Sequence, residues 1–163
     1  MSEALKILLT TVSTVIVGVF VLVVGQVCIR FFIEPVHDLR KAIGDVGDAL
    51  IYYAHLYMRP KEIAADAGWS AGSPLPPVYS EERGKASDAL RQKASLLLVR
   101  GNAVFKYRWF VRLSMIPSWE SLTTAHRELL NLSNSVSRGN PLVNAERRRI
   151  IAESLDLKIT IEN

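Results

Sequence analysis

The chain has 163 residues, of which 49% are hydrophobic, and its formal net charge is +4 at pH 7. A single cysteine excludes an intrachain disulfide, and this composition fits a reducing compartment. One apolar segment, residues 7–29, raises the hydrophobic share; the roughly 130 residues that remain after an anchor of residues 1–33 are enough for one domain with its own core.

Residues 7–29 contain no charged side chain. As a helix they would be roughly 35 Å long, which exceeds the ~30 Å hydrocarbon core of a bilayer. We therefore predict one transmembrane helix. A cleaved signal peptide would have a basic start and a small-residue cleavage site. A lipoprotein would have a small residue before Cys28, and a pilin-like segment would have an acidic residue inside the apolar run. The sequence has none of these features.

Basic residues are more frequent after the apolar segment than before it. Lys6 precedes the segment, whereas Arg30, Arg40 and Lys41 follow it closely. The positive-inside rule then places the following domain in the cytoplasm. We predict a single-pass protein of the inner (cytoplasmic) membrane, with residues 1–33 as its anchor.

Small residues occupy one side of the apolar segment. Their spacing of four and then seven residues brings them onto one helix face: Thr10, Thr14, Gly18 and Gly25. Small residues let helices approach closely in lipid, so this face predicts self-association or packing on a partner span. Thr and Gly are also common in such helices, and the pattern alone leaves both interpretations open.

The domain at residues 34–163 begins with a heptad pattern. Its apolar residues are spaced alternately by three and four positions: Val36, Leu39, Ile43, Val46, Leu50, Tyr53 and Tyr57. This seam predicts an amphipathic helix that packs either within the chain or between protomers. Gly44 and Gly47 indicate that a neighbouring helix approaches closely. The Pro/Gly-rich residues 59–79 are predicted to be a loop between helices.

Periodic apolar residues predict three further helices, at about residues 80–100, 119–136 and 144–155. Each begins with a side chain that can cap a helix: Ser80, Ser118 and Asn144. The predicted fold is all-α, with one N-terminal transmembrane helix followed by a small bundle of about four helices.

Two shorter segments each allow two interpretations. The aromatic and basic residues 104–113 either lie in the bilayer interface or form a short buried helix. A helical arrangement points Lys106 away from Arg108 and Arg112, which favours the buried helix. The Asn- and Ser-rich residues 131–137 either fray as a helix end, which we favour, or make a packed polar contact between helices.

Positive charge is concentrated in residues 83–112. Eight basic residues and Asp88 give this segment +7, which leaves −3 for the rest of the chain (4 − 7). The basic residues, called here the basic belt, are Arg83, Lys85, Arg91, Lys93, Arg100, Lys106, Arg108 and Arg112. The belt predicts contact with anionic headgroups or an acidic partner rather than nucleic acid; a solvated helix face is the plain alternative.

The sequence lacks the common catalytic and cofactor-binding patterns. The paired Glu-x-x-His helices of a di-iron bundle, a phosphate-binding glycine loop and a G-x-S-x-G turn are all missing. We therefore expect no enzyme activity, no metal and no cofactor. A membrane-bound hydrolase, as a remote alternative, would depend on Asp45, Asp48 or His126.

Four short motifs follow the apolar segment: Ile33-Glu34-Pro35, Ala49-Leu50 with Tyr52-Tyr53-Ala54, Ile116-Pro117-Ser118 and Leu132-Ser133-Asn134-Ser135. Together they resemble an uncharacterised group of bacterial single-span membrane proteins with a helical cytoplasmic domain. The resemblance covers most of the chain after the span. It implies the same architecture and no particular activity.

These patterns together predict a non-enzymatic, membrane-anchored interaction or assembly protein. Its expected partners are the lipid bilayer and either further copies of itself, in a homo-oligomer, or other membrane-protein subunits. Two alternatives remain open at this point. One is a membrane-perturbing effector of the defence or toxin type, and the other is an accessory subunit of a larger membrane complex.

Overall fold

The computed structural model describes residues 3–58, 77–136 and 141–158. Every secondary-structure element in these ranges is a helix, which confirms the all-α class for the described part of the chain. The predicted loop at residues 59–79 lies mostly outside the described residues.

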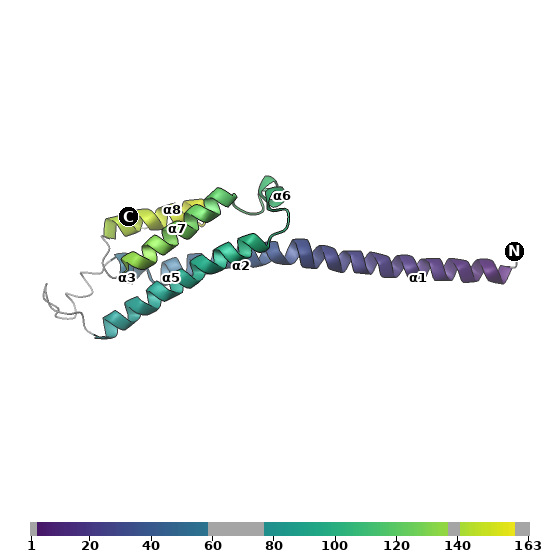
Figure 1. Cartoon of the computed structure of the whole chain (residues 1–163), viewed down its shortest axis with the longest axis horizontal. Coiled ribbons are helices and arrows are strands. Elements are labelled where there is room, and N and C mark those ends of the chain that lie inside the picture. The colour runs from purple at the N-terminus through teal and green to yellow at the C-terminus, as the bar shows by residue number, and fades with distance from the viewer. Residues whose placement is uncertain (1–2, 59–76, 137–140, 159–163) are drawn as a thin grey trace.

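The N-terminal part of the chain is one long rod (Figure 1). Helix α1 (Glu3–Cys28) passes through a short π-helix, η1 (Ile29–Ile33), into α2 (Glu34–Tyr52). The 47 residues from Lys6 to Tyr52 are helical without a break, a length of roughly 70 Å. The rod therefore joins the apolar segment to the rest of the molecule with no intervening loop.

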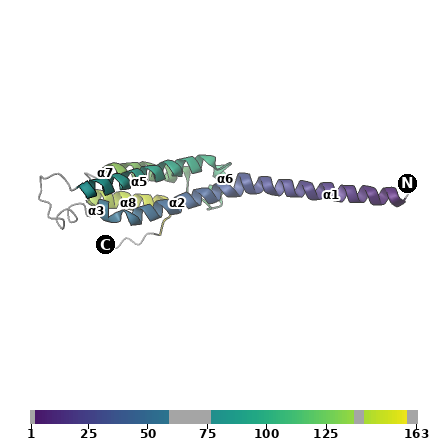
Figure 2. The same cartoon turned by 90° about the horizontal axis from the view of Figure 1, so that it is seen from below.

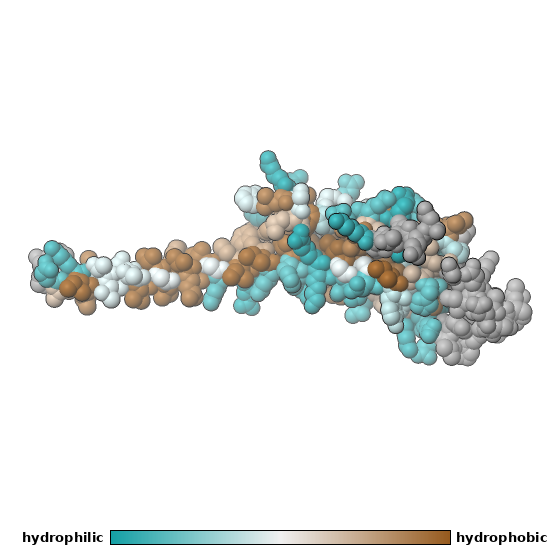
Figure 3. All heavy atoms as spheres, turned by 180° about the vertical axis from the view of Figure 1, so that it is seen from behind, coloured by the Kyte–Doolittle hydropathy of each residue, from teal (hydrophilic) through white to brown (hydrophobic). Residues whose placement is uncertain are grey.

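Within the described residues, this rod is the one helix long and apolar enough to cross a membrane. The apolar side chains of α1 are exposed along its length, and Phe20, for example, is 67% exposed. Apolar residues line the rod, while hydrophilic residues spread over the packed helices (Figure 3). The surface of α1 thus has the polarity of a lipid-facing helix, which agrees with a membrane span by length and composition.

The remaining helices pack beside α2 (Figure 2). They are α3 (Ala54–Met58), α5 (Pro77–Ala103), α6 (Tyr107–Arg112), α7 (Trp119–Ser135) and α8 (Pro141–Ser154). Helix α5 packs against α2 and α7, and α7 packs against α8. We refer to α2, α5, α7 and α8 with their shared core as the bundle.

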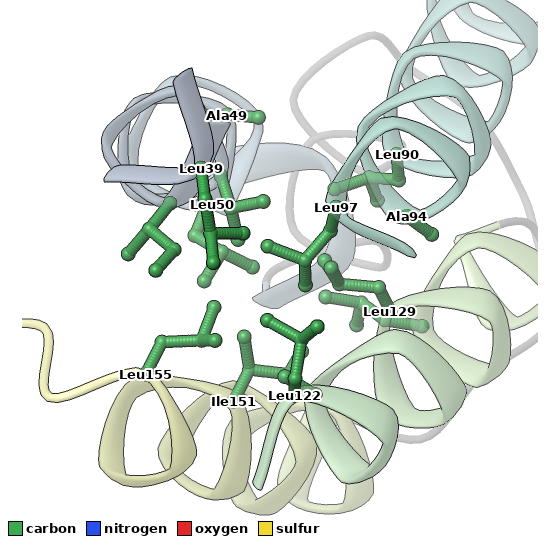
Figure 4. Close-up of a cluster of buried hydrophobic side chains, with 14 of the residues drawn as sticks. Leu39, Ala49, Leu50, Leu90, Ala94, Leu97, Leu122, Leu129, Ile151 and Leu155 are labelled. Atoms are coloured by element: carbon green, nitrogen blue, oxygen red, sulfur yellow. The ribbon is translucent and has the colours of Figure 1, made fainter. Parts of the chain in front are cut away.

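The core of the bundle is formed by leucines, isoleucine and alanine from all of its helices (Figure 4). Leu39 and Leu50 enter it from α2, and Leu97 from α5. Each of these three side chains is fully buried. Burial of such side chains stabilises a fold by about 1.5–3 kcal/mol each relative to exposure, so this core is what holds the bundle together.

Two helices begin earlier than the sequence pattern predicts. Helix α5 begins at Pro77 rather than Ser80, and α8 begins at Pro141 rather than Asn144. Proline suits the first helical position because its φ angle is already helical and its missing N–H has no partner there. The predicted cap of α7 is confirmed, since Ser118 Oγ accepts a hydrogen bond from the Ser121 backbone N–H (3.0 Å).

Candidate membrane-interface site

The junction between α1 and α2 contains a wide helical turn with a clear cause. Pro35 has no backbone N–H to donate, and its ring crowds the carbonyl of Phe31 four residues earlier. In η1 the Glu34 N–H instead bonds the carbonyl of Ile29, five residues back. This single π-type turn accommodates the proline and lets the helix continue. Phe32 is part of the turn and contacts the segment before α6.

The segment that approaches the junction precedes α6. Phe105 packs edge-on against Phe32, with ring centroids 5.7 Å apart. The next residue, Lys106, has a left-handed backbone (φ 54°), and its ammonium lies 5.7 Å from the centre of the Phe105 ring. The left-handed residue turns the chain sharply into α6, so α6 lies at the end of the bundle nearest to α1 (Figure 1).

Helix α6 is fastened to both of its neighbours. The Tyr107 hydroxyl donates to the carbonyl of Pro117 (2.9 Å), and its ring packs edge-on against Trp119. Burial raises the pKa of Tyr107 to about 12, so the phenol stays a neutral donor. On the other side, Arg40 Nε donates to the carbonyl of Met115 (2.9 Å). These bonds fix the position of α6 relative to α2 and α7.

The outer surface of α6 is aromatic and exposed. Trp109 is 73% exposed, Leu113 is 59% exposed and Phe105 is 54% exposed. Trp109 lies within α6, Leu113 caps its C-terminal end, and Phe105 stands before the left-handed Lys106. An open groove of about 550 Å³ runs between α6 and the rod and is lined by Phe32, Phe105, Lys106, Trp109 and Phe110.

The structure supports the buried-helix interpretation of residues 104–113 on one side only: Val104 is buried and Tyr107, Phe110 and Val111 pack against the core, while the residues of the outer side are exposed. The argument from helical phase failed for Lys106 because this residue stands before α6 in a left-handed conformation. Its ammonium lies at the aromatic groove. Arg108 and Arg112, within α6, are exposed. None of these three residues forms an ion pair with another described residue.

The other five residues of the basic belt are bonded or buried within the chain. Arg83 is 6% exposed, and Lys85 pairs with Glu81 on the same helix (2.6 Å). Arg91 donates a hydrogen bond to Asn134 (2.7 Å). Lys93 pairs with Asp45 (3.2 Å), and Arg100 pairs with Asp38 (2.8 Å). The last three join α5 to α7 or α2. The cations left for an outside partner are thus those around α6.

The heptad seam is buried inside the chain. Leu39, Val46 and Leu50 are fully buried, and Tyr57 likewise has no exposed surface. Tyr53 at the distal end is half-buried against the same core. Of the two arrangements that the spacing allowed, the structure shows packing within the monomer. Gly47 fits this arrangement, because a Cβ there would lie 3.5 Å from Leu157, whereas nothing lies within 4 Å of Gly44.

The small-residue face of α1 has no partner among the described residues. The hydroxyls of Thr10 and Thr14 donate to their own helix, to the carbonyls of Lys6 and Thr10 (2.9 Å each). No atom lies within 4 Å of a Cβ built on Gly18 or Gly25. The face is therefore smooth, internally hydrogen-bonded and open to a neighbouring helix.

A polar contact closes the end of the bundle farthest from α1. Asn144 is buried; its amide donates to the carbonyl of Tyr57 (2.9 Å), and its oxygen accepts from the Ser135 hydroxyl (2.6 Å). The Tyr57 hydroxyl in turn donates to the carbonyl of Leu50. Asn144 is therefore an interhelical bridge and not a cap. The Asn- and Ser-rich end of α7 thus makes a packed polar contact between helices instead of the frayed end that the sequence favours.

Two of the three polar residues considered for catalysis have partners within the chain, whereas Asp48 is exposed. His126 Nδ1 donates to the carbonyl of Ala94 (2.9 Å), and Asp45 is paired with Lys93. Glu34 and His37 have Glu-x-x-His spacing and are both exposed. Within the described ranges, no three His, Cys, Asp or Glu side chains gather as metal ligands would.

Sequence reasoning missed the contact between Phe32 and Phe105, which creates the aromatic groove. The signal available was a surplus of apolar residues: positions 107, 110 and 111 pack this six-residue helix against the core, which leaves positions 105, 109 and 113 outside it. Comparisons with protein-family models, characterised proteins and solved structures give no match. The functional argument therefore rests on the geometry of this chain.

Proposed function

We propose that this chain is a single-pass, non-enzymatic assembly protein of the inner membrane, whose span associates with further copies while its bundle is held in the cytoplasm. The observation that carries the proposal is the unbroken helix from Lys6 to Tyr52. It links a lipid-compatible rod directly to the core of the bundle. Association through α1 would therefore also set the positions of the bundles.

The same helix supports a permanent anchor over a cleaved signal peptide. A signal peptidase needs an accessible segment with small residues after the apolar run. Here the run continues through Arg30 and Phe31 within a π-turn and then into α2, whose next turns are buried in the core. Cleavage at this point would require the helix to unwind beside the bundle.

A comparison of the two apolar helix faces favours α1, and not α2, as the site where copies of the chain associate. The seam of α2 is occupied by the bundle, so it offers no apolar face to a second chain. The small-residue face of α1 is free among the described residues, and its threonine hydroxyls need no further acceptor. Close helix packing in lipid favours such a surface.

Oxidative cross-linking of the native cysteine in membranes tests the proposal. Cys28 is exposed and follows Gly25 by three residues, so it lies on the side of the small-residue face. We expect a covalent dimer in the intact membrane and a discrete homo-oligomer after gentle detergent extraction. A chain that stays monomeric in both measurements would overturn the assembly proposal.

A pair of matched variants identifies the contact face. Thr14→Leu with Gly18→Leu enlarges the small-residue face and should abolish the Cys28 cross-link. Val12→Leu with Val23→Leu adds bulk on the opposite side of the helix, at 100° per residue, and should leave the cross-link intact. Foreign spans co-purifying in fixed stoichiometry, with no self-cross-link, would instead identify an accessory subunit.

A further inference from the structure

The geometry points to a second contact with the membrane: we propose that the α6 surface formed by Phe105, Trp109 and Leu113 lies in the headgroup region of an anionic bilayer. Lys106, Arg108 and Arg112 would then meet lipid phosphates. The inference rests on the membrane anchoring proposed above, but it does not depend on self-association.

The depth of α6 relative to the span is set by a direct contact. A hydrocarbon core of ~30 Å takes up about 20 residues of helix. Centred on the apolar run, these end near Val27, so Phe32 lies about five residues, or roughly 7 Å, beyond the core. That distance is the thickness of the interfacial layer. Because Phe105 packs on Phe32, the start of α6 is held at the same level.

The chemistry of the surface fits that layer. Trp109 is 73% exposed and lines a groove whose wall is almost entirely apolar, and exposure of this apolar surface would be unfavourable in water. Tryptophan is enriched at membrane interfaces because its ring is apolar and its N–H is a donor. Phe32, which follows the end of α1 in the rod, also lines the groove, so the groove adjoins the rod just beyond the apolar segment.

The charges around the groove fit phosphate rather than hydrocarbon. Lys106, Arg108 and Arg112 have no ion-pair partner among the described residues, and Arg30 on the rod adds a fourth such cation. Juxtamembrane cations of this kind attract the anionic lipids of a cytoplasmic leaflet. The bonds from Tyr107 to Pro117 and from Arg40 to Met115 keep α6 in this place, so no rearrangement is needed for docking.

Fluorescence of Trp109 in the full chain, reconstituted into vesicles, tests the inference. Trp69→Phe and Trp119→Phe leave Trp109 as the one tryptophan, and the second substitution keeps an aromatic ring beside Tyr107. In vesicles that contain phosphatidylglycerol, we expect Trp109 to be shielded from aqueous acrylamide and quenched by lipids brominated near the headgroup. Equal access to acrylamide in anionic vesicles and in detergent would overturn the proposal.

Two charge variants separate headgroup contact from other causes of shielding. Arg108→Glu with Arg112→Glu should abolish the shielding, while Lys85→Glu, a belt residue near the distal start of α5, should leave it intact. The same effect from both variants would refute a local contact. Shielding that disappears when the protein is diluted in excess lipid would show that a second copy covers α6, and would also refute it. The Cys28 cross-link, measured in parallel, reports separately on assembly.

Discussion

Among the glycines in the described part of the chain, Gly101, in the last turn of α5, is the one least tolerant of an added methyl group. A Cβ there would overlap Cδ2 of Leu122 and would lie 3.3 Å from Cζ3 of Trp119. Leu122 is fully buried, so it has no free space into which to move. We predict that Gly101→Ala destabilises the bundle, because α5 and α7 would have to separate.

The magnitude follows from two opposing contributions. Overpacking a filled core costs about 1–3 kcal/mol. Replacing glycine by alanine inside a helix returns up to about 1 kcal/mol, and less in a final turn. The net loss should be about 1–2 kcal/mol, which lowers the melting temperature by several degrees in a domain of this size. Gly84 on the same helix is exposed with no atom within 4 Å of its Cβ, so Gly84→Ala should stabilise by up to about 1 kcal/mol.

Urea unfolding of the full chain in mild detergent measures both effects, with near-ultraviolet circular dichroism as the signal for packed aromatics. This signal follows the bundle and is insensitive to the α1 helix, which detergent keeps folded. The reasoning is refuted if Gly101→Ala is as stable as the parent chain, or if Gly84→Ala is destabilised to the same extent.

Three further outcomes follow from polar contacts. Asn144→Ala leaves the carbonyl of Tyr57 without its donor and should lower the free energy of unfolding by about 1–3 kcal/mol in the same assay; an unchanged value would show that the bridge is dispensable. Burial raises the pKa of Tyr57 to about 12, above its unfolded value of 10.0. The neutral phenol therefore contributes fully to the free energy of unfolding below pH 10, and this contribution is lost as the pH rises to 12. Tyr57→Phe should make the loss of stability at alkaline pH shallower. The Arg100–Asp38 pair is about half-exposed, so a double-mutant cycle should give a coupling of only about 0.2–1 kcal/mol; a much larger value would contradict surface screening.

The helices and the core were predictable because they depend on local periodicity. The spacing from Val36 to Leu50 requires one face of the helix to be buried, and the structure buries that face. The same spacing cannot say which helices cover it, since α5 and a second copy of the chain would satisfy the pattern equally. That choice depends on how the segments after residue 76 fold back, which no local pattern encodes.

The aromatic groove could not be predicted for a related reason. It depends on Phe32 and Phe105, which are 73 positions apart in the sequence, and on the left-handed conformation of Lys106. A helical projection assumes that Lys106 continues the geometry of α6, and a single residue with positive φ makes that assumption fail. Asn144 was misassigned as a cap because Pro141 extends α8 by one turn and moves Asn144 into its buried side.

Because helix continues without a break from α1 into α2, a chain anchored by α1, as proposed above, would transmit any tilt of the span to the bundle. Helix α2 extends roughly 28 Å beyond the junction, so a change of 10° in the tilt of the span would displace its far end by ~5 Å. Spans adjust their tilt to the thickness of the surrounding bilayer. The position of Tyr52 relative to the membrane would therefore change with bilayer thickness. Because α6 lies beside the junction of α1 and α2, its contact with the membrane would limit the range of tilt.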